Sequence, residues 1–469
     1  MPYRRFVERV GPQDASFFYL ETPNVHQHVG GLQVLDPSTR PDGKLPFGDV
    51  VRLIQSRLHM VPRFRQRAVR PPLPIALPMW LDDPEFDIAF HVRRAALPAP
   101  GGRTELQEFV QRVFSRPLDH TKPLWELYVI EGMQDGLAAV LTKVHHAMID
   151  GAAAMDIASV VFDTTPEPRS VRVPPWHPQP WPSNTELIFG ALRDEILHPV
   201  QTLANAARVT LDAPARAARL AGGVLSGIAD TLGAGVPVPN SPLNRPVGPN
   251  RRFAMTEAPL QEFKDIKNAL GGTVNDVVLA SVAGGLHRWL RSRHEPVRGR
   301  TLRAMVPVSV RLPDDPSGMG NRLSTLFVDL PVGPMGAKRR LASIREETKN
   351  LKESRQAVGA EFLMNIGAWA PATIHALAAR VAARTRFFNL VVSNVPGPQI
   401  PLYIAGAKLL GAYPLMPLAG GTGLSVAVTS LAGTMAFGLV GDWDTLPDIE
   451  VLAAGLAESV EELRKAAGR

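Results

Sequence analysis

The sequence of 469 residues contains no cysteine. This absence excludes a disulfide framework, a thiolate nucleophile and every metal site that needs a cysteine ligand. It also excludes a cysteinyl acyl-enzyme. If the chain transfers acyl groups, it therefore uses either a serine, threonine or lysine intermediate or direct attack of the acceptor on the acyl donor.

The sequence also lacks segments typical of secretion or membrane insertion. Residues Met1–Arg9 contain arginines but no apolar stretch after them, unlike a secretory signal. The long charge-free run Leu409–Gly441 is broken by Pro414, Pro417 and several glycines. We expect this run to form a buried hairpin with its turn at Ala432–Gly433, not a transmembrane helix. We therefore expect a cytoplasmic protein, soluble or peripheral to the inner membrane or lipid bodies.

Acidic residues are the minority charge: 44 Asp and Glu stand against 51 Lys and Arg, a formal net charge of +7. Such an excess of positive charge would favour binding to nucleic acid, to an anionic lipid surface or to a phosphate-bearing substrate. A genome biased towards arginine would give the same excess without any function. The sequence contains no zinc-finger spacing, no basic run with interleaved aromatic residues and no RNP-like string. We therefore expect no nucleic-acid partner.

Hydrophobic periodicity divides the chain into two α/β regions, residues 1–165 and 251–469, joined by a crossover, residues 166–250. Helical spacing predicts helices, and short apolar runs predict strands. In the first region we expect helices over Phe47–Leu58 and Thr104–Val113 and strands over Leu124–Glu131 and Leu137–Val144. In the second region we expect helices over Val277–Leu290, Leu341–Leu351 and Ala372–Ala383 and strands over Leu302–Val310 and Leu323–Leu330.

The crossover begins with many prolines between Pro166 and Pro182, which predict irregular structure. The alanine-rich segment Leu187–Ile228 follows and predicts helix. Its basic residues are Arg193, Arg208, Arg216 and Arg219. A surface helix that touches membrane or lipid and a solvated helical linker both fit this pattern, and the frequency of basic amphipathic helices favours the linker.

A histidine pair follows the predicted strand Leu137–Val144, in the sequence His145-His146-Ala-Met-Ile-Asp150-Gly151. A histidine at a strand exit with an aspartate four residues later suits a general base, because an unperturbed imidazole has a pKa of about 6.5. Two alternatives stay open: histidines with a purely structural role, and a zinc site. Zinc needs a third or fourth ligand at suitable spacing and none follows, so we expect no metal.

Several further short motifs occur in a fixed order along the chain. With the histidine motif they are Asp14–Phe18, His28–Leu32, Pro62–Arg65, Pro123–Glu126, His145–Gly151, Asn275–Val277, Val306–Arg311, Gly320–Asn321 and Ser393–Pro398. Each motif alone is weak, but their order and spacing are specific and span essentially the whole chain. In this set the chain resembles the bacterial wax ester synthase/acyl-CoA:diacylglycerol acyltransferase family.

The resemblance implies an α/β, two-domain fold of the CoA-dependent acyltransferase (chloramphenicol acetyltransferase-like) type, with an active-site tunnel at the domain interface. It implies an O-acyltransferase that moves a long-chain acyl group from acyl-CoA, a co-substrate, to a fatty alcohol or diacylglycerol, with no permanently bound cofactor. Peripheral contact with a membrane or lipid droplet fits these substrates. The alternatives are a condensation domain of an assembly line, which shares the histidine motif, and a non-catalytic lipid-droplet-binding protein.

The resemblance also implies roles for the motif residues. His146 is the general base, and no covalent acyl-enzyme forms. His145 is expected to be a structural, buried imidazole bonded to backbone, and Gly151 to let the chain pass close to the substrate. Asp150 is expected to point away from His146 and to form an ion pair with Arg311 that ties the two domains together.

The remaining motif residues each carry two interpretations. Asn275 either donates to the oxyanion of the tetrahedral intermediate or caps the helix that begins near Val277, and the two are equal. Ser393 and Asn394 either line the tunnel or shape a Pro-Gly turn, and we favour the turn. The other tunnel candidates are Pro123, Leu124 and Trp125. For these three, a place in the core at the entry to a strand is the favoured alternative.

Overall fold

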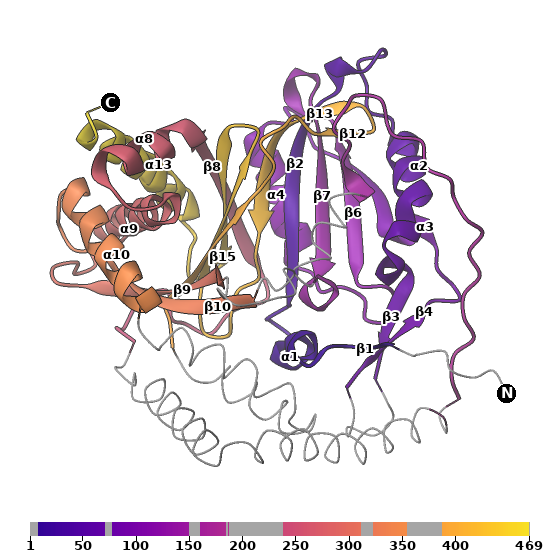
Figure 1. Cartoon of the computed structure of the whole chain (residues 1–469), viewed down its shortest axis with the longest axis horizontal. Helices are drawn as coiled ribbons and strands as arrows, with labels where there is room; N and C mark the ends of the chain where they lie inside the picture. The colour runs from indigo at the N-terminus through magenta and orange to yellow at the C-terminus, as the bar shows by residue number, and fades with distance from the viewer. Residues whose placement is uncertain are drawn as a thin grey trace, which may run out of the picture.

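A computed structural model of the chain describes residues 8–70, 77–149, 160–183, 186, 238–310, 322–353 and 387–468. The chain forms two halves that stand side by side, each built on a six-stranded sheet (Figure 1). A small third sheet has the order β1–β4–β3 and belongs to the N-terminal half. Its strands are β1 (Glu8–Arg9), β3 (Gln66–Val69) and β4 (Met79–Asp82).

The N-terminal sheet has the strand order β12–β13–β2–β7–β6–β5, antiparallel except for the parallel pair β5 and β6. Its strands are β2 (His28–Asp36), β5 (Val92–Ala96), β6 (Trp125–Glu131), β7 (Ala138–His145), β12 (Tyr403–Ile404) and β13 (Ala407–Leu415). The α-helices of this half are α1 (Pro12–Leu20), α2 (Phe47–Arg57), α3 (Ile88–His91) and α4 (Arg103–Phe114). Short 3₁₀ turns lie at η1 (Pro37–Thr39), η2 (Leu58–Met60), η3 (Pro62–Arg65), η4 (Gln134–Gly136) and η5 (His146–Met148).

The two faces of the N-terminal sheet pack into different cores, because successive strand residues point to opposite faces. On β7, Val140 joins the core that contains apolar residues of α2. The next residue, Leu141, joins a second core with residues of α4. This second core also contains Phe253 and Met255 of the C-terminal half, so α4 and its neighbours form the contact between the halves.

Lys143 of β7 is fully buried and caps the end of α4. Its ammonium group donates to the carbonyl oxygens of Val113, at 3.1 Å, and Arg116. Val113 lies in the last turn of the helix, at the negative end of its dipole, and Arg116 follows the C-cap Ser115. Burial lowers the pKa of Lys143 to about 8. The lysine therefore holds α4 against the sheet through hydrogen bonds that replace its hydration.

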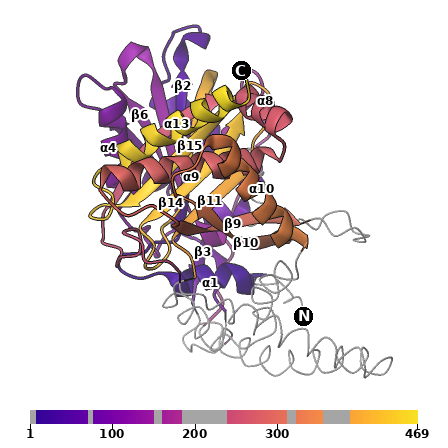
Figure 2. The ribbon, with the colours of Figure 1, turned by 90° about the vertical axis from the view of Figure 1, so that its left-hand side faces the viewer.

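The C-terminal sheet has the order β10–β9–β11–β14–β15–β8. Its strands are β8 (Arg251–Pro259), β9 (Thr301–Val310), β10 (Arg322–Pro331), β11 (Leu390–Pro396), β14 (Leu424–Leu431) and β15 (Thr434–Asp442). The helices of this half are α8 (Leu260–Leu270), α9 (Val274–Ser292), α10 (Ala337–Glu353) and α13 (Ile449–Ala466). They cover the face of the sheet that is turned away from the N-terminal half (Figure 2), and the largest core lies between them and the sheet.

The predicted hairpin within the charge-free run is confirmed as β14 and β15. Its turn residues Ala432 and Gly433 have φ angles of 45° and 89°, the left-handed region that tight hairpin turns require. No single helix in the described ranges is long and apolar enough to cross a membrane. The pair α8 and α9 meets those criteria only together, across a bend of 100°.

The other predicted elements that fall within the described ranges are present, and α9 and α10 extend beyond their predicted ends. The predicted helices Leu187–Ile228 and Ala372–Ala383 lie outside the described residues. The proline-rich stretch is irregular from Pro166 to Ser183, as predicted. It lies against the small sheet, where the guanidinium of Arg67 covers the ring of Trp181 at 4.8 Å.

The division of the chain at residue 251 does not coincide with the division into sheets. Strands β12 and β13 come from the C-terminal region, yet β13 pairs with β2 and completes the N-terminal sheet. At this crossing β13 comes very close to β15, because a Cβ atom on Gly438 would lie 1.9 Å from the carbonyl oxygen of Pro414. Only glycine at position 438 allows the two strands to come this close. Dividing the sequence into two regions at residue 251 did not predict this crossing.

Candidate active site

The histidine pair lies where β7 ends and the single turn η5 begins. His145 is the last residue of β7, paired with His28 of β2. His146 opens η5, and its backbone N–H donates to the carbonyl oxygen of Gln27 at 2.8 Å. The change from strand to turn rotates the second imidazole away from the first, so the adjacent rings occupy different environments.

Helix α1 packs on η5 and covers both imidazoles. The ring of Phe18 stacks on His145 with centroids 4.5 Å apart, and the ring of Phe17 stacks on His146 with centroids 3.9 Å apart. Each phenyl face removes water from one side of an imidazole. The motif Asp14–Phe18 therefore contacts the histidine motif in the structure, although the two motifs lie at opposite ends of the N-terminal region in the sequence.

The side chain of His145 is buried, with 1% of its surface exposed, and one hydrogen bond from the backbone fixes its tautomer. Its Nδ1 accepts a hydrogen bond from the backbone N–H of Ala147 at 3.1 Å. The neutral ring therefore carries its proton on Nε2, which faces Oε1 of Glu21 at 3.4 Å. Burial lowers the pKa of His145 although Glu21 acts in the opposite direction. The predicted contact of this buried imidazole with the backbone is present.

Glu21 follows the last residue of α1 and links the segments around the histidine pair. Its Oε1 accepts the backbone N–H of Gln27 at 3.0 Å, and its Oε2 lies 3.1 Å from Nε2 of His120. Burial alone would raise the pKa of Glu21, but the contacts with His120 and His145 and the bond from Gln27 hold it well below its usual range. The group is therefore a carboxylate, and through Gln27 it also supports the backbone of His146.

Glu21, His120 and His145 form the one triad in the described residues whose ligand atoms could hold a metal ion, all within 4.8 Å of one another. The third ligand that the sequence spacing lacked is thus present in space. The tautomer of His145 does not fit a metal centre. A metal-bound histidine offers a lone pair to the ion and donates from its other nitrogen, whereas here the other nitrogen accepts. The chemistry of the donors favours a carboxylate–imidazole contact.

His146 is half-buried beneath Phe17. Burial lowers its pKa to about 4, because the charged ring would lose hydration. The ring is therefore uncharged at neutral pH and able to accept a proton. The other residues of the histidine motif, Asp150 and Gly151, and Arg311, the predicted ion-pair partner of Asp150, lie outside the described residues.

Of the two alternatives for Asn275, the helix cap is wrong. Helix α9 begins at Val274, and its N-cap is Thr273, whose hydroxyl accepts the backbone N–H of Asp276 at 3.2 Å. The carboxylate of Asp276 in turn accepts the backbone N–H of Thr273 at 2.8 Å, which completes a capping box. Asn275 is thus free of the capping role and lies half-buried in the first turn of α9.

The amide of Asn275 meets Asn394 of β11, which donates from Nδ2 to the Asn275 Oδ1 at 3.4 Å. The turn that we favoured for Ser393 and Asn394 is wrong for these two residues, because both lie within β11 and pair with Ala427 and Val428 of β14. The structure therefore brings together Asn275 and Asn394, two candidate site residues from motifs that are far apart in the sequence.

Leu124 and Trp125 lie in the core of the N-terminal half, 1% and 2% exposed, which agrees with the favoured alternative. The indole N–H of Trp125 donates to the carbonyl oxygen of Phe64 at 2.8 Å. Its ring is stacked between Phe64 and His91, with centroids 4.7 Å and 4.5 Å away. Pro123, just before them, precedes the first residue of β6 by two positions.

Sequence reasoning missed Glu21, His120 and Gln27 as neighbours of the histidine pair. Glu21 alone had a sequence signal, because it follows closely after the motif Asp14–Phe18. The pairing of β2 with β7 brings Gln27 to the backbone of His146. That pairing is a long-range contact which local periodicity does not reveal.

Comparison with known proteins gives matches over both halves. A family model described as the wax ester synthase/diacylglycerol acyltransferase catalytic domain matches residues 10–278, and the model of the C-terminal domain of that family matches residues 319–464. A probable diacylglycerol O-acyltransferase of Mycobacterium tuberculosis is 35% identical over 464 residues, which cover 97% of this chain and 99% of the relative. A putative diacylglycerol O-acyltransferase of the same species is 33% identical and covers 97% and 90%.

Solved structures show the same likeness. The wax ester synthase/diacylglycerol acyltransferase from Marinobacter aquaeolei has a TM-score of 0.69 at 29% identity, over 98% of this chain and 100% of that one. The first condensation domain of the calcium-dependent antibiotic synthetase has a TM-score of 0.59 at 15% identity, over 98% and 96%. The second match concerns the fold alone. Together the two confirm the predicted fold class.

Proposed function

The chain belongs to the wax ester synthase/diacylglycerol acyltransferase family and is an acyl-CoA-dependent O-acyltransferase; from this premise we propose that it esterifies a fatty alcohol or diacylglycerol with His146 as the general base. The observation that carries the proposal is the environment of the His146 ring. His146 directly follows the last residue of β7. Its ring lies under Phe17 and is uncharged at neutral pH because of burial. An uncharged imidazole can accept a proton, and the phenyl ring of Phe17 excludes water from one of its faces.

In the proposed step His146 accepts the proton of the acceptor hydroxyl while the hydroxyl oxygen bonds to the thioester carbonyl carbon of acyl-CoA. The tetrahedral intermediate then loses its carbon–sulfur bond, and the imidazolium returns the proton to the departing CoA thiolate. No group of the protein becomes acylated. General-base assistance of this kind contributes about 10²–10⁴-fold, and positioning of the two substrates supplies much of the rest.

The low basicity of the resting ring is compatible with this role. A base with a pKa near 4 is fully deprotonated at neutral pH but accepts a proton reluctantly. Negative charge on the developing oxyanion and thiolate favours the imidazolium, so the basicity of His146 rises as the reaction proceeds. Glu21 supports the proposal indirectly, because it anchors His145 and, through Gln27, the backbone of His146.

Asn275 is the proposed oxyanion donor. Its Oδ1 accepts from Asn394, which leaves its own Nδ2 hydrogens to donate to a developing negative charge. Its place in the first turn of α9, at the positive end of the helix dipole, adds to that stabilisation.

The test follows thiol release by the purified full chain with palmitoyl-CoA and, in turn, hexadecanol, diacylglycerol and hexadecylamine. We expect release with a hydroxyl acceptor and much less with the amine. Failure with every hydroxyl acceptor would overturn the substrate class, and preference for the amine would favour the chemistry of a condensation domain.

His146→Ala tests the base and is expected to lower kcat about 10²–10⁴-fold while the circular dichroism spectrum stays unchanged. The matched control is His177→Ala, since that histidine is exposed in the proline-rich stretch. A folded His146→Ala protein with full turnover would refute the base. Mass spectrometry after incubation with palmitoyl-CoA alone checks the second claim, and a covalent palmitoyl adduct on the chain would refute direct transfer.

A further inference from the structure

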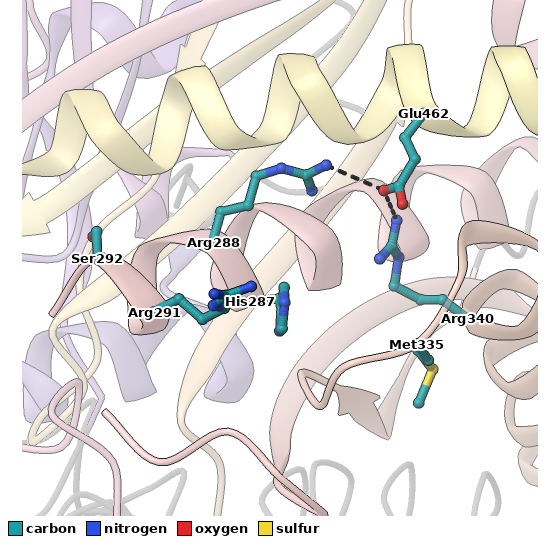
Figure 3. A pocket seen from close by; sticks show the side chains of 7 residues that line it. All are labelled: His287, Arg288, Arg291, Ser292, Met335, Arg340 and Glu462. Atoms are coloured by element: carbon teal, nitrogen blue, oxygen red, sulfur yellow. Dashed lines mark hydrogen bonds and ion pairs between the residues drawn. The ribbon is translucent and has the colours of Figure 1, made fainter. Parts of the chain in front are cut away.

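A pocket of about 470 Å³ lies in the helical layer of the C-terminal half (Figure 3). Helix α9 forms its floor, with walls from the start of α10, the residues just before it, and the end of α13. It is lined by His287, Arg288, Arg291, Ser292, Met335, Arg340 and Glu462. This layer covers the face of the sheet that is turned away from the N-terminal half (Figure 2), and none of the proposed catalytic residues lines the pocket.

The lining carries more positive charge than its single carboxylate offsets. Glu462 is shared: its Oε2 lies 2.8 Å from the guanidinium of Arg340 and 3.2 Å from that of Arg288. Three arginines against one glutamate leave a formal charge of +2 in the lining. Glu458 reaches Arg288 from outside the lining at 3.0 Å, and one net positive charge remains when it is counted.

One buried N–H group of these arginines has no acceptor, and one of the arginines has no ion-pair partner in the described part of the chain. The side chain of Arg340 is 3% exposed, and its Nε is buried without a hydrogen-bond partner. Arg291 is exposed at the end of α9 and makes no ion pair with any residue in the described part of the chain. Buried donors are normally paired, so the Nε of Arg340 is an exception, and the exposed guanidinium of Arg291 keeps donors available to an anion in the pocket.

A purely structural role explains only part of this cluster. Arg340 also donates to the hydroxyl of Ser459 at 3.2 Å, and with Glu462 it ties α10 to α13. Arg288 likewise links α9 to α13 through Glu458 and Glu462. This structural role occupies parts of two guanidinium groups. It accounts neither for Arg291, which touches no carboxylate among the described residues, nor for a cavity between the charged groups.

We propose that this pocket binds a small anion that carries a phosphate group, at a site separate from the proposed catalytic residues. A guanidinium offers paired donors that match phosphate oxygens, and three arginines line this pocket. The volume lies within the range of small-molecule sites, about 300–1,000 Å³, so it accommodates a phosphorylated metabolite or the headgroup of an anionic lipid. His287 donates from Nδ1 to the carbonyl of Val332 at 2.7 Å, which fixes its ring at the pocket wall.

The experiment titrates the purified full chain with pyrophosphate in a low-salt chloride buffer, by calorimetry and without acyl substrates. We expect one saturable site whose affinity falls as potassium chloride is added, because exposed charges are screened. The variant Arg291→Gln is expected to raise Kd about tenfold, since it removes charge-assisted donors without breaking an internal ion pair. The matched control is Arg52→Gln on α2, whose side chain is 76% exposed.

A second arm distinguishes a soluble ligand from a lipid headgroup. Flotation compares vesicles of phosphatidylcholine alone with vesicles that also contain phosphatidic acid. Binding in either arm that depends on Arg291 but not on Arg52 supports the proposal and identifies the source. The proposal is overturned if neither probe binds, or if both variants weaken binding equally. Because no acyl transfer is measured, failure here is independent of the esterification proposal.

Discussion

Phe17 lies flat on His146, with ring centroids 3.9 Å apart and 20° between the planes. The next residue of α1 stacks in the same way on His145. One helix therefore fixes both imidazoles through consecutive side chains. Because a phenyl face offers no hydrogen bond to replace lost water, this packing disfavours the imidazolium form of His146, and the proton affinity of the proposed base depends on α1.

The acidic limb of the activity profile is expected far below the usual range for histidine. Since burial lowers the pKa of His146 to about 4, the neutral base is fully populated at pH 7 and is lost only as the pH falls through about 4. We expect kcat/KM for the acceptor to stay level from pH 8 to about 5. Initial rates across this range, with circular dichroism at each pH, provide the measurement.

Folding stability limits the same experiment, because the depressed pKa also has a cost. Between the unfolded value of about 6.5 and the folded value near 4, the unfolded chain binds more protons at this histidine, so stability falls as the pH falls through that window. The variant Phe17→Ala readmits water and is expected to move the activity limb upwards, towards 6.5. A wild-type limb already at 6.5 would show that the ring is well hydrated.

Glu21→Gln tests the carboxylate that links His145, His120 and Gln27. The amide keeps the shape of the side chain but removes the charge that faces Nε2 of His145. We expect kcat to fall about tenfold to a hundredfold with little change in the KM for acyl-CoA, because a small misplacement of the base costs this much. His120→Asn is the control, since it removes one partner and leaves the Gln27 bond. A rise in the KM for acyl-CoA of about tenfold to a hundredfold, without loss of kcat, would contradict a positioning role.

The sequence predicted features of this site that depend on local pattern. The apolar run Leu137–Val144 predicts a strand, which places His145 and His146 at its exit, and the structure has β7 end at His145. Trp125 was open to two interpretations because an aromatic residue at a strand entry packs equally well into a core or a cavity wall. Its side of the sheet depends on β6 pairing with β7, which the structure alone supplies.

Long-range pairing accounts for the features that were missed. Glu21 reaches His145 only because α1 folds back over η5, and Asn394 reaches Asn275 only because β11 lies beside the start of α9. The turn interpretation for Asn394 relied on the nearby proline and glycine, whereas the parallel pairing of β11 with β14 extends the strand to Pro396. Local propensity is overridden here because β14 offers backbone partners to β11 as far as Pro396.

Asp163→Ala is expected to unfold the N-terminal half more easily than any surface change. The guanidinium of Arg57 is fully buried and contacts both carboxylate oxygens of Asp163 at 2.7 Å, beside the backbone bridge from Asp163 to Tyr403 of β12. Removing one partner leaves a buried charge unpaired and costs about 3–5 kcal/mol. Urea unfolding measures the loss. The double variant Arg57→Met with Asp163→Leu should regain much of it, and a double variant as unstable as the single one would contradict this account.

Asn275→Ala separates transition-state stabilisation from helix capping. Since Thr273 and Asp276 form the capping box, loss of the Asn275 amide should leave the stability of α9 nearly unchanged. Loss of one oxyanion donor lowers kcat about 10²–10³-fold. Asn394→Ala should have a smaller effect on kcat, because it only releases the amide of Asn275 from its orientation.

Thr273→Ala is the control for helix capping. We expect this variant to lose about 1 kcal/mol of folding stability and to retain its kcat. If Thr273→Ala lowered kcat as much as Asn275→Ala, the position of the helix start would matter more than the amide, and the oxyanion role would be refuted.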